Sequence, residues 1–114
     1  MITIIVPTYN RPSLIIRLIE FYKNYKFCKL LILDSSNKKI IKNKYADQDK
    51  INVIEFSSDI FISEKIIYST QYIETDYVVL CADDDTIIPS SLMICKEFLE
   101  NNKEFASAQG WSYP

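Results

Sequence analysis

Short apolar runs rich in β-branched residues recur along the chain, and most precede a segment of helical periodicity. Four of these runs, at 2–6, 29–33, 51–56 and 76–82, predict strands. Continuous rather than alternating hydrophobicity is typical of strands in a parallel sheet, because helices cover both of its faces. A fifth segment, EFASAQG at 104–110, predicts one more strand.

Apolar residues spaced three and four positions apart predict three helices, at about 12–25, 63–74 and 89–101. Pro12 and Pro89 suit the first turns of the first and third helices, and Asn10 and Ser13 are candidate caps for the first. The polar, lysine-rich stretch between the second and third strands predicts an irregular connection with one helical turn.

Strand and helix therefore alternate with short connections, which favours an α/β fold with a mostly parallel sheet and helices on both faces. A length of 114 residues fits one domain. Because the sequence stops just after the fifth predicted strand, where a complete small domain more often ends in a helix or polar tail, we expect the chain to be one half of a larger unit.

Composition excludes several classes of function. The formal net charge of −2 provides no basic excess for binding nucleic acid through its phosphates. The chain has no histidine, which excludes Ser-His-Asp and Cys-His chemistry within it, and its single glycine excludes glycine-rich phosphate loops. The three cysteines form no CxxC pair, so neither a zinc site nor a disulfide framework is indicated.

The hydrophobic pattern also indicates where in the cell the protein is expected. No apolar run approaches the roughly 18 residues that a transmembrane helix needs, and the first residues lack the basic start of a signal peptide. We therefore expect a cytoplasmic protein, with a membrane-peripheral location as an option for a longer full-length form.

Polar clusters follow three of the predicted strands. These are Thr8-Tyr9-Asn10-Arg11, Asp34-Ser35-Ser36 and Asp83-Asp84-Asp85. In open α/β sheets, ligands bind outside the carboxyl ends of the strands, so the three clusters are expected to converge on one crevice.

The three adjacent aspartates repel one another and require positive charge nearby if they are half-buried. Mg²⁺ or Mn²⁺ suits such oxygen ligands and commonly binds substrate phosphates through one or two carboxylates. A solvated turn, or a cap for the following helix, explains the same residues without a metal. Likewise, Asp34 is either an acceptor for a base N–H or ribose hydroxyl, or a turn former.

Three motifs in register, TIIVPTYNRPSLI, LILDSS and TDYVVLCADDDTIIPSSL, resemble the nucleotide-binding half of a family 2 glycosyltransferase. The resemblance covers essentially the whole chain and implies the Rossmann-like, A-type fold of nucleotide-diphospho-sugar transferases. It implies that Pro7, Thr8, Tyr9 and Asn10 line the nucleoside site, and that Asp34 holds the base, usually uracil. Arg11 is a further candidate, for pairing with phosphate, although an exposed helix-start arginine would look the same.

The resemblance also implies that Asp83, Asp84 and Asp85 form the DxD region, which binds ribose and a divalent metal on the diphosphate. Ala82 stands where the family's commonest pattern has its first aspartate. We therefore interpret the triplet itself as the DxD, with Asp85 as metal ligand and Asp83 toward the ribose, or as a metal ligand with it. Lys65 lies one residue from the position of a nucleotide-approaching basic residue, and a solvated helix lysine is the alternative.

The expected reaction transfers a sugar from a nucleotide donor, most simply a UDP-sugar, to a hydroxyl of a saccharide or lipid-linked acceptor, as in cell-surface polysaccharide synthesis. The family's general base belongs to a second half, and only Glu97, Glu100 and Glu104 follow the aspartates here. A non-catalytic nucleotide-sugar-binding module and a purely structural role are the alternatives. A response-regulator receiver would need acidic residues where the first strand is followed by Thr8 and Tyr9.

Overall fold

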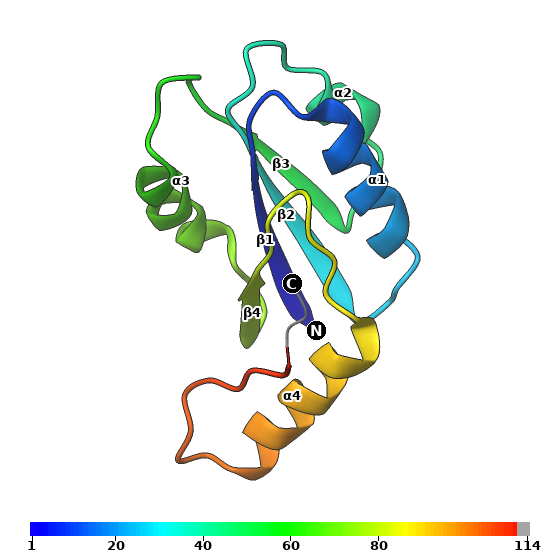
Figure 1. Ribbon diagram of the computed structural model, residues 1–114, viewed down its shortest axis with the longest axis vertical. Helices are drawn as coiled ribbons and strands as arrows, with labels where there is room; N and C mark the ends of the chain where they lie inside the picture. Colours follow the sequence, from blue (N-terminus) through cyan, green and yellow to red (C-terminus); the bar gives the residue numbers. More distant parts are fainter. Residues whose placement is uncertain (112–114) are drawn as a thin grey trace.

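A computed structural model describes residues 1–111 and contains one sheet of four parallel strands, in the order β3-β2-β1-β4 (Figure 1). The strands are β1 (Ile2–Thr8), β2 (Cys28–Asp34), β3 (Ile51–Glu55) and β4 (Tyr77–Leu80). Every neighbouring pair is parallel, so each connection crosses over the sheet. The α/β class and the parallel sheet that the sequence predicted are confirmed.

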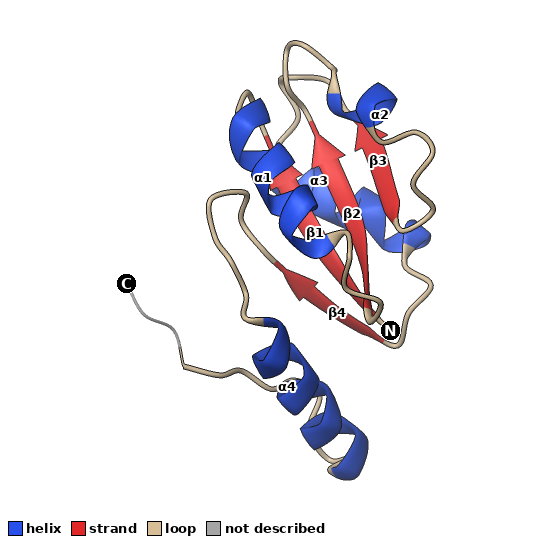
Figure 2. Cartoon of the chain, turned by 90° about the vertical axis from the view of Figure 1, so that its right-hand side faces the viewer, coloured by secondary structure: helices blue, strands red, loops and turns tan. Residues whose placement is uncertain are grey.

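Helices lie on both faces of this sheet (Figures 1 and 2). The helices α1 (Pro12–Tyr22) and α2 (Ile41–Lys44) lie on one face, and α3 (Ile62–Ser69), extended by the 3₁₀ turn η1 (Thr70–Tyr72), lies on the other. The single turn of α2 is the one expected in the lysine-rich connection. The helix α4 (Pro89–Asn101) follows β4 and runs away from the sheet.

Successive residues of β1 point to opposite faces, and both faces are packed. Ile4 and Val6 are fully buried in the larger core with Ile15 and Ile19 of α1. On the other face, Ile5 joins Leu31 and Leu33 of β2 in a smaller core, against which Ile66 of α3 packs. This packing explains why β1 and β2 are almost continuously apolar in sequence.

The chain beyond β4 differs from the sequence prediction. Residues 104–110 do not form the fifth strand, and most of that segment is exposed. A strand needs a neighbour for its backbone hydrogen bonds, and no described strand pairs with this segment. The fourth strand is also shorter than predicted, and Val78 and Leu80 are 51% and 55% exposed.

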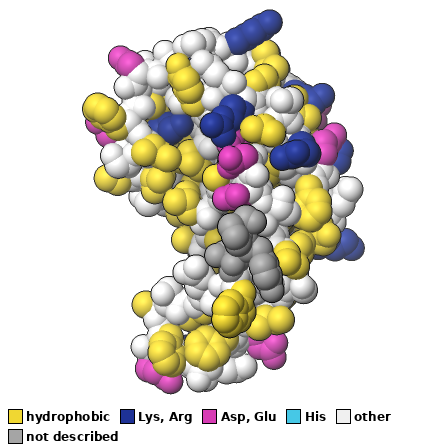
Figure 3. Space-filling view, viewed as in Figure 1, with side chains coloured by type: hydrophobic (Ala, Val, Ile, Leu, Met, Phe, Trp, Pro, Cys, Tyr) yellow, Lys and Arg dark blue, Asp and Glu magenta, His cyan; other side chains and the backbone are white. Residues whose placement is uncertain are grey.

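Helix α4 is only loosely attached, since Leu92 is its one buried residue. Its exposed apolar residues include Ile94 and Phe98, and hydrophobic side chains gather on the lobe around α4 (Figure 3). The predicted α4 bounds are nevertheless confirmed, because the Pro89 start and the helix-forming residues after it are local signals.

The predicted caps of α1 are wrong. Arg11 occupies the N-cap position, and no side chain makes a capping hydrogen bond there. Asn10 instead has a φ of 53°, in the left-handed region that asparagine tolerates better than most residues. The helix also ends at Tyr22, three residues before the predicted end.

Candidate functional site

An open cavity of about 380 Å³ lies at the carboxyl ends of the central strands. Its size falls within the usual range for small-molecule sites. All three sequence-predicted clusters contribute to its walls, so their convergence is confirmed. The lining residues are Pro7, Thr8, Tyr9, Arg11, Ser35, Ser58, Ile60, Ile62, Lys65 and Asp83.

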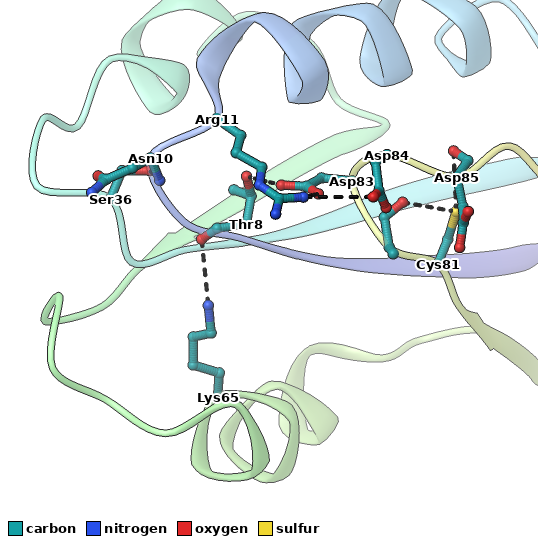
Figure 4. Close-up of polar contacts among 10 residues, drawn as sticks. Thr8, Asn10, Arg11, Ser36, Lys65, Cys81, Asp83, Asp84 and Asp85 are labelled. Carbon is teal, nitrogen blue, oxygen red and sulfur yellow. Dashed lines mark hydrogen bonds and ion pairs between the residues drawn. The ribbon is translucent and has the colours of Figure 1, made fainter.

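The carboxylate of Asp83 joins the ends of β1 and β4. It is buried, and Oδ2 accepts a hydrogen bond from the Thr8 hydroxyl at 2.9 Å. Its Oδ1 accepts from the Arg11 guanidinium at 3.1 Å, and the same Arg11 nitrogen lies 3.6 Å from Asp84 Oδ2 (Figure 4). Arg11 therefore supplies the positive charge that two of the three adjacent aspartates need.

Asp84 and Asp85 have a different environment from Asp83, because both are exposed. The Asp85 N–H donates to the Ala82 carbonyl and closes a tight turn. Asp84 lies between Arg11 and Asp85 (Figure 4). Within residues 1–111, no three His, Cys, Asp or Glu side chains gather into a group that could hold a metal. Asp84 and Asp85 do not line the cavity, but their exposed carboxylate oxygens are the donor type that Mg²⁺ and Mn²⁺ take.

Asp34, at the end of β2, is fully buried and does not itself line the cavity. Its Oδ1 accepts the Ser36 N–H at 2.9 Å, while its buried Oδ2 has no partner. Ser36 Oγ in turn accepts the Asn10 N–H, and Asn10 Oδ1 accepts the Asn37 N–H, both at 2.8 Å. Asn10 therefore ties the loop after β1 to the loop after β2, which accounts for its left-handed backbone.

Lys65 is buried although it belongs to a helix, so the interpretation as a solvated lysine is wrong. Its Nζ reaches from α3 to the strand ends, where it donates to Ser35 Oγ at 2.8 Å and lies 3.4 Å from the Thr8 and Leu33 carbonyl oxygens (Figure 4). Burial lowers the pKa of Lys65, and the negative charges of Asp34 and Asp83 partly oppose this change. Lys65 thus provides a desolvated cation on the wall of the cavity.

Sequence reasoning missed one side of the cavity. Ser58 and Ile60 come from the connection between β3 and α3, and Ile62 is the first residue of α3. The same strand-end rule that singled out the other clusters applies here, because Ser57, Ser58 and Asp59 closely follow the third apolar run. Tyr9, which the resemblance places at a nucleoside site, lines this cavity, and its side chain is half-exposed toward solvent.

The sequence model of one family, Glycosyl transferase family 2, matches residues 3–113. The chain belongs to this family. The match spans every described strand and helix that positions the cavity, apart from the first residue of β1. A search of curated proteins gave no match.

Membership supports a glycosyltransferase domain and, as partners of such a domain, a nucleotide-sugar donor and an acceptor. It agrees with the α/β architecture and with the resemblance drawn from the three motifs. In the described part of the chain, no helix is long and apolar enough to cross a membrane.

Proposed function

We propose that the cavity binds the nucleoside diphosphate part of a sugar donor, most simply a UDP-sugar, for metal-dependent transfer to an acceptor hydroxyl. The observation that carries the proposal is the meeting of Thr8, Lys65 and Asp83 at one cavity, from three separate elements. The cationic Lys65 suits the anionic diphosphate of such a ligand, and the Asp83 carboxylate suits the hydroxyl groups of its nucleoside.

The nucleoside end is assigned to the loop after β1 and the end of β2. The half-exposed ring of Tyr9 offers a face on which a base can stack. The unpartnered Oδ2 of Asp34 is a candidate acceptor for a base N–H. Because Asp34 is fully buried, a base would reach that oxygen only after movement of the loop that begins with Ser35 and Ser36.

The diphosphate end is assigned to Arg11, Lys65 and the aspartates. Bound Mg²⁺ or Mn²⁺ would supply positive charge against the departing nucleoside diphosphate. The exposed carboxylates of Asp85 and Asp84 are the candidate ligands, while Asp83, fixed by Thr8 and Arg11, faces the ribose. Arg11 can exchange its aspartate partners for phosphate oxygens, because its side chain is half-exposed.

The acceptor side of the reaction has no candidate in the cavity. None of Glu97, Glu100 and Glu104 lines it, and all three lie on or after α4. We therefore assign donor binding to this chain and give none of its carboxylates the role of general base. Ala82 stands where the family's commonest pattern has its first aspartate. This departure favours a second candidate function, a non-catalytic module that binds nucleotide-sugar.

The test is calorimetry with UDP in the presence and absence of Mn²⁺, on the wild type, Asp85→Ala and the control Asp47→Ala. Asp47 is an exposed aspartate in the connection before β3 and does not line the cavity. Removing a metal ligand should weaken Mn²⁺-dependent UDP binding by about 10-fold or more, because even the loss of a group that only orients a ligand weakens metal binding about 10- to 100-fold. Asp47→Ala should bind as the wild type does.

Unchanged UDP affinity in Asp85→Ala, with Mn²⁺ present, would remove Asp85 from the metal site. No UDP binding by the wild type under any metal condition would overturn the proposed function. Binding without UDP-sugar hydrolysis or transfer would favour the non-catalytic module.

A further inference from the structure

Tyr22, at the end of α1, makes an unusual contact with the loop that carries the aspartates. We call residues 81–88, between β4 and α4, the acidic loop. The Tyr22 hydroxyl donates to the Ile87 carbonyl oxygen at 2.6 Å and accepts from the Ile87 N–H at 2.7 Å. One buried side chain thus satisfies both backbone polar groups of a single loop residue.

The two halves of the acidic loop are held in different ways. At its start, the Cys81 N–H donates to the Ile5 carbonyl of β1, and Asp83 is fixed by Thr8 and Arg11. Asp84 and Asp85 are exposed, and the backbone bond from Asp85 to Ala82 is internal to the loop. In the described chain, the Tyr22 hydroxyl therefore makes the side-chain hydrogen bonds that tie the backbone at Ile87 to the sheet-and-helix core. The Ile87 side chain also packs against this core, and Cys81 Sγ donates to the Asp85 carbonyl oxygen at 3.8 Å.

We propose that Tyr22 is a positioning residue that fixes the second half of the acidic loop, so that Asp84 and Asp85, which do not line the cavity themselves, stay next to Asp83 at its edge. The proposal rests on the proposed function. Tyr22 does not line the cavity and acts only through the Ile87 backbone. The contact could not be found from the sequence, because Tyr22 is there one more apolar residue on the buried face of a helix.

The protonation state of Tyr22 is consistent with this role. Burial raises its pKa to about 12, although the hydrogen bond to Ile87 acts in the opposite direction. The hydroxyl therefore keeps its proton at neutral pH, and a protonated hydroxyl can donate to the carbonyl and accept from the amide at the same time.

The chain contains a matched control for this residue. Tyr45 is also buried, belongs to the same hydrophobic core as Tyr22, and has a hydroxyl without a hydrogen-bond partner. Tyr22→Phe and Tyr45→Phe therefore remove the same atom from the same core. Only Tyr22→Phe leaves a loop N–H and C=O without their partner.

The experiment combines hydrogen exchange at the Ile87 amide with calorimetry of UDP, with and without Mn²⁺. In Tyr22→Phe we expect exchange at Ile87 to become at least about tenfold faster, because the amide loses its acceptor. We expect Mn²⁺-dependent UDP affinity to fall about tenfold, and UDP affinity without metal to change less than about threefold. Tyr45→Phe should change neither.

Two results would overturn the positioning role. One is Tyr22→Phe with fast Ile87 exchange and wild-type UDP affinity in Mn²⁺. The other is an equal loss of binding with and without metal, or in Tyr45→Phe, which would indicate a general effect on the core.

If Tyr22→Phe fails to fold, the wild type provides the decisive measurement. The Ile87 amide should then exchange as slowly as that of Cys81, which is held by β1. Exchange at the rate of an open loop would overturn the proposal. A wild type that binds no UDP with Mn²⁺ overturns the proposed function together with the positioning role, whereas retained binding in Tyr22→Phe overturns the positioning role alone.

Discussion

The central strands of the sheet and its β4 edge are built differently, and we call them the well-packed side and the looser side. On one side, β1 and β2 are seven residues long and almost entirely buried between α1 and α3. On the other side, β4 has four residues with alternate side chains exposed, and α4 buries a single residue. The cavity lies where the two sides meet.

This difference divides the site by its chemistry. The buried polar groups Asp34, Lys65 and Thr8 belong to the well-packed side, where hydrogen bonds offset the cost of removing them from water, except at the unpartnered Oδ2 of Asp34. The exposed carboxylates Asp84 and Asp85 belong to the other side and stay accessible to a ligand. The well-packed side therefore fixes the geometry of the site, whereas the looser side contributes exposed carboxylates.

The largest expected effect compares one isoleucine from each side. Ile32 of β2 is fully buried, whereas Ile94 of α4 is 66% exposed. Ile32→Ala should lower the free energy of unfolding by about 2–5 kcal/mol, through lost burial and a residual cavity. Ile94→Ala should change it by less than about 0.5 kcal/mol. Urea denaturation measures both, and similar losses would mean that α4 packs against more than the structure shows.

The next effect is a loss of stability at alkaline pH. It concerns Tyr22, whose hydrogen bonds to Ile87 link the two sides. Because its pKa is raised from 10.0 to about 12, the folded state holds this proton more tightly than the unfolded chain does. Its contribution of about 2–3 kcal/mol is therefore fully present below pH 10 and is lost as the pH rises toward 12. The stability of Tyr22→Phe should fall less steeply above pH 10 than that of the wild type.

Urea midpoints measured from pH 8 to pH 11 would show this difference between the two proteins. Burial also raises the pKa values of Cys28 and Cys81, so both proteins should lose stability above pH 9. Parallel curves for the wild type and Tyr22→Phe would contradict the assignment to Tyr22.

The smallest effect compares two adjacent aspartates of the acidic loop, Asp83, which is hydrogen-bonded to the well-packed side, and Asp84, which is exposed. Asp83→Ala removes a buried acceptor of the Thr8 hydroxyl and of Arg11, and should cost about 1–3 kcal/mol of stability. Asp84→Ala removes only an exposed, longer ion pair to Arg11 and should cost no more than about 1 kcal/mol. Thermal unfolding at pH 7 compares them, and a larger loss for Asp84→Ala would reverse the proposed division of the site.

Local sequence patterns were sufficient for much of the fold. The strands that form the sheet, the starts of α1 and α4 at Pro12 and Pro89, and the polar clusters at the strand ends are all readable from periodicity and turn chemistry. Their convergence follows from topology, since parallel strands end at one edge of the sheet. The family resemblance drawn from the same motifs agrees with the family match.

The sequence alone therefore determined the four strands and the helices, their order, and three of the polar clusters that share the cavity. Only the tertiary structure decided that Lys65 is buried against Ser35, that Asp83 rather than Asp84 or Asp85 is fixed, and that Tyr22 holds Ile87. It also showed that 104–110 forms no strand. The physical reason is common to all of these: burial and hydrogen bonding depend on partners distant in the sequence, whereas helix and strand patterns repeat over a few neighbouring residues.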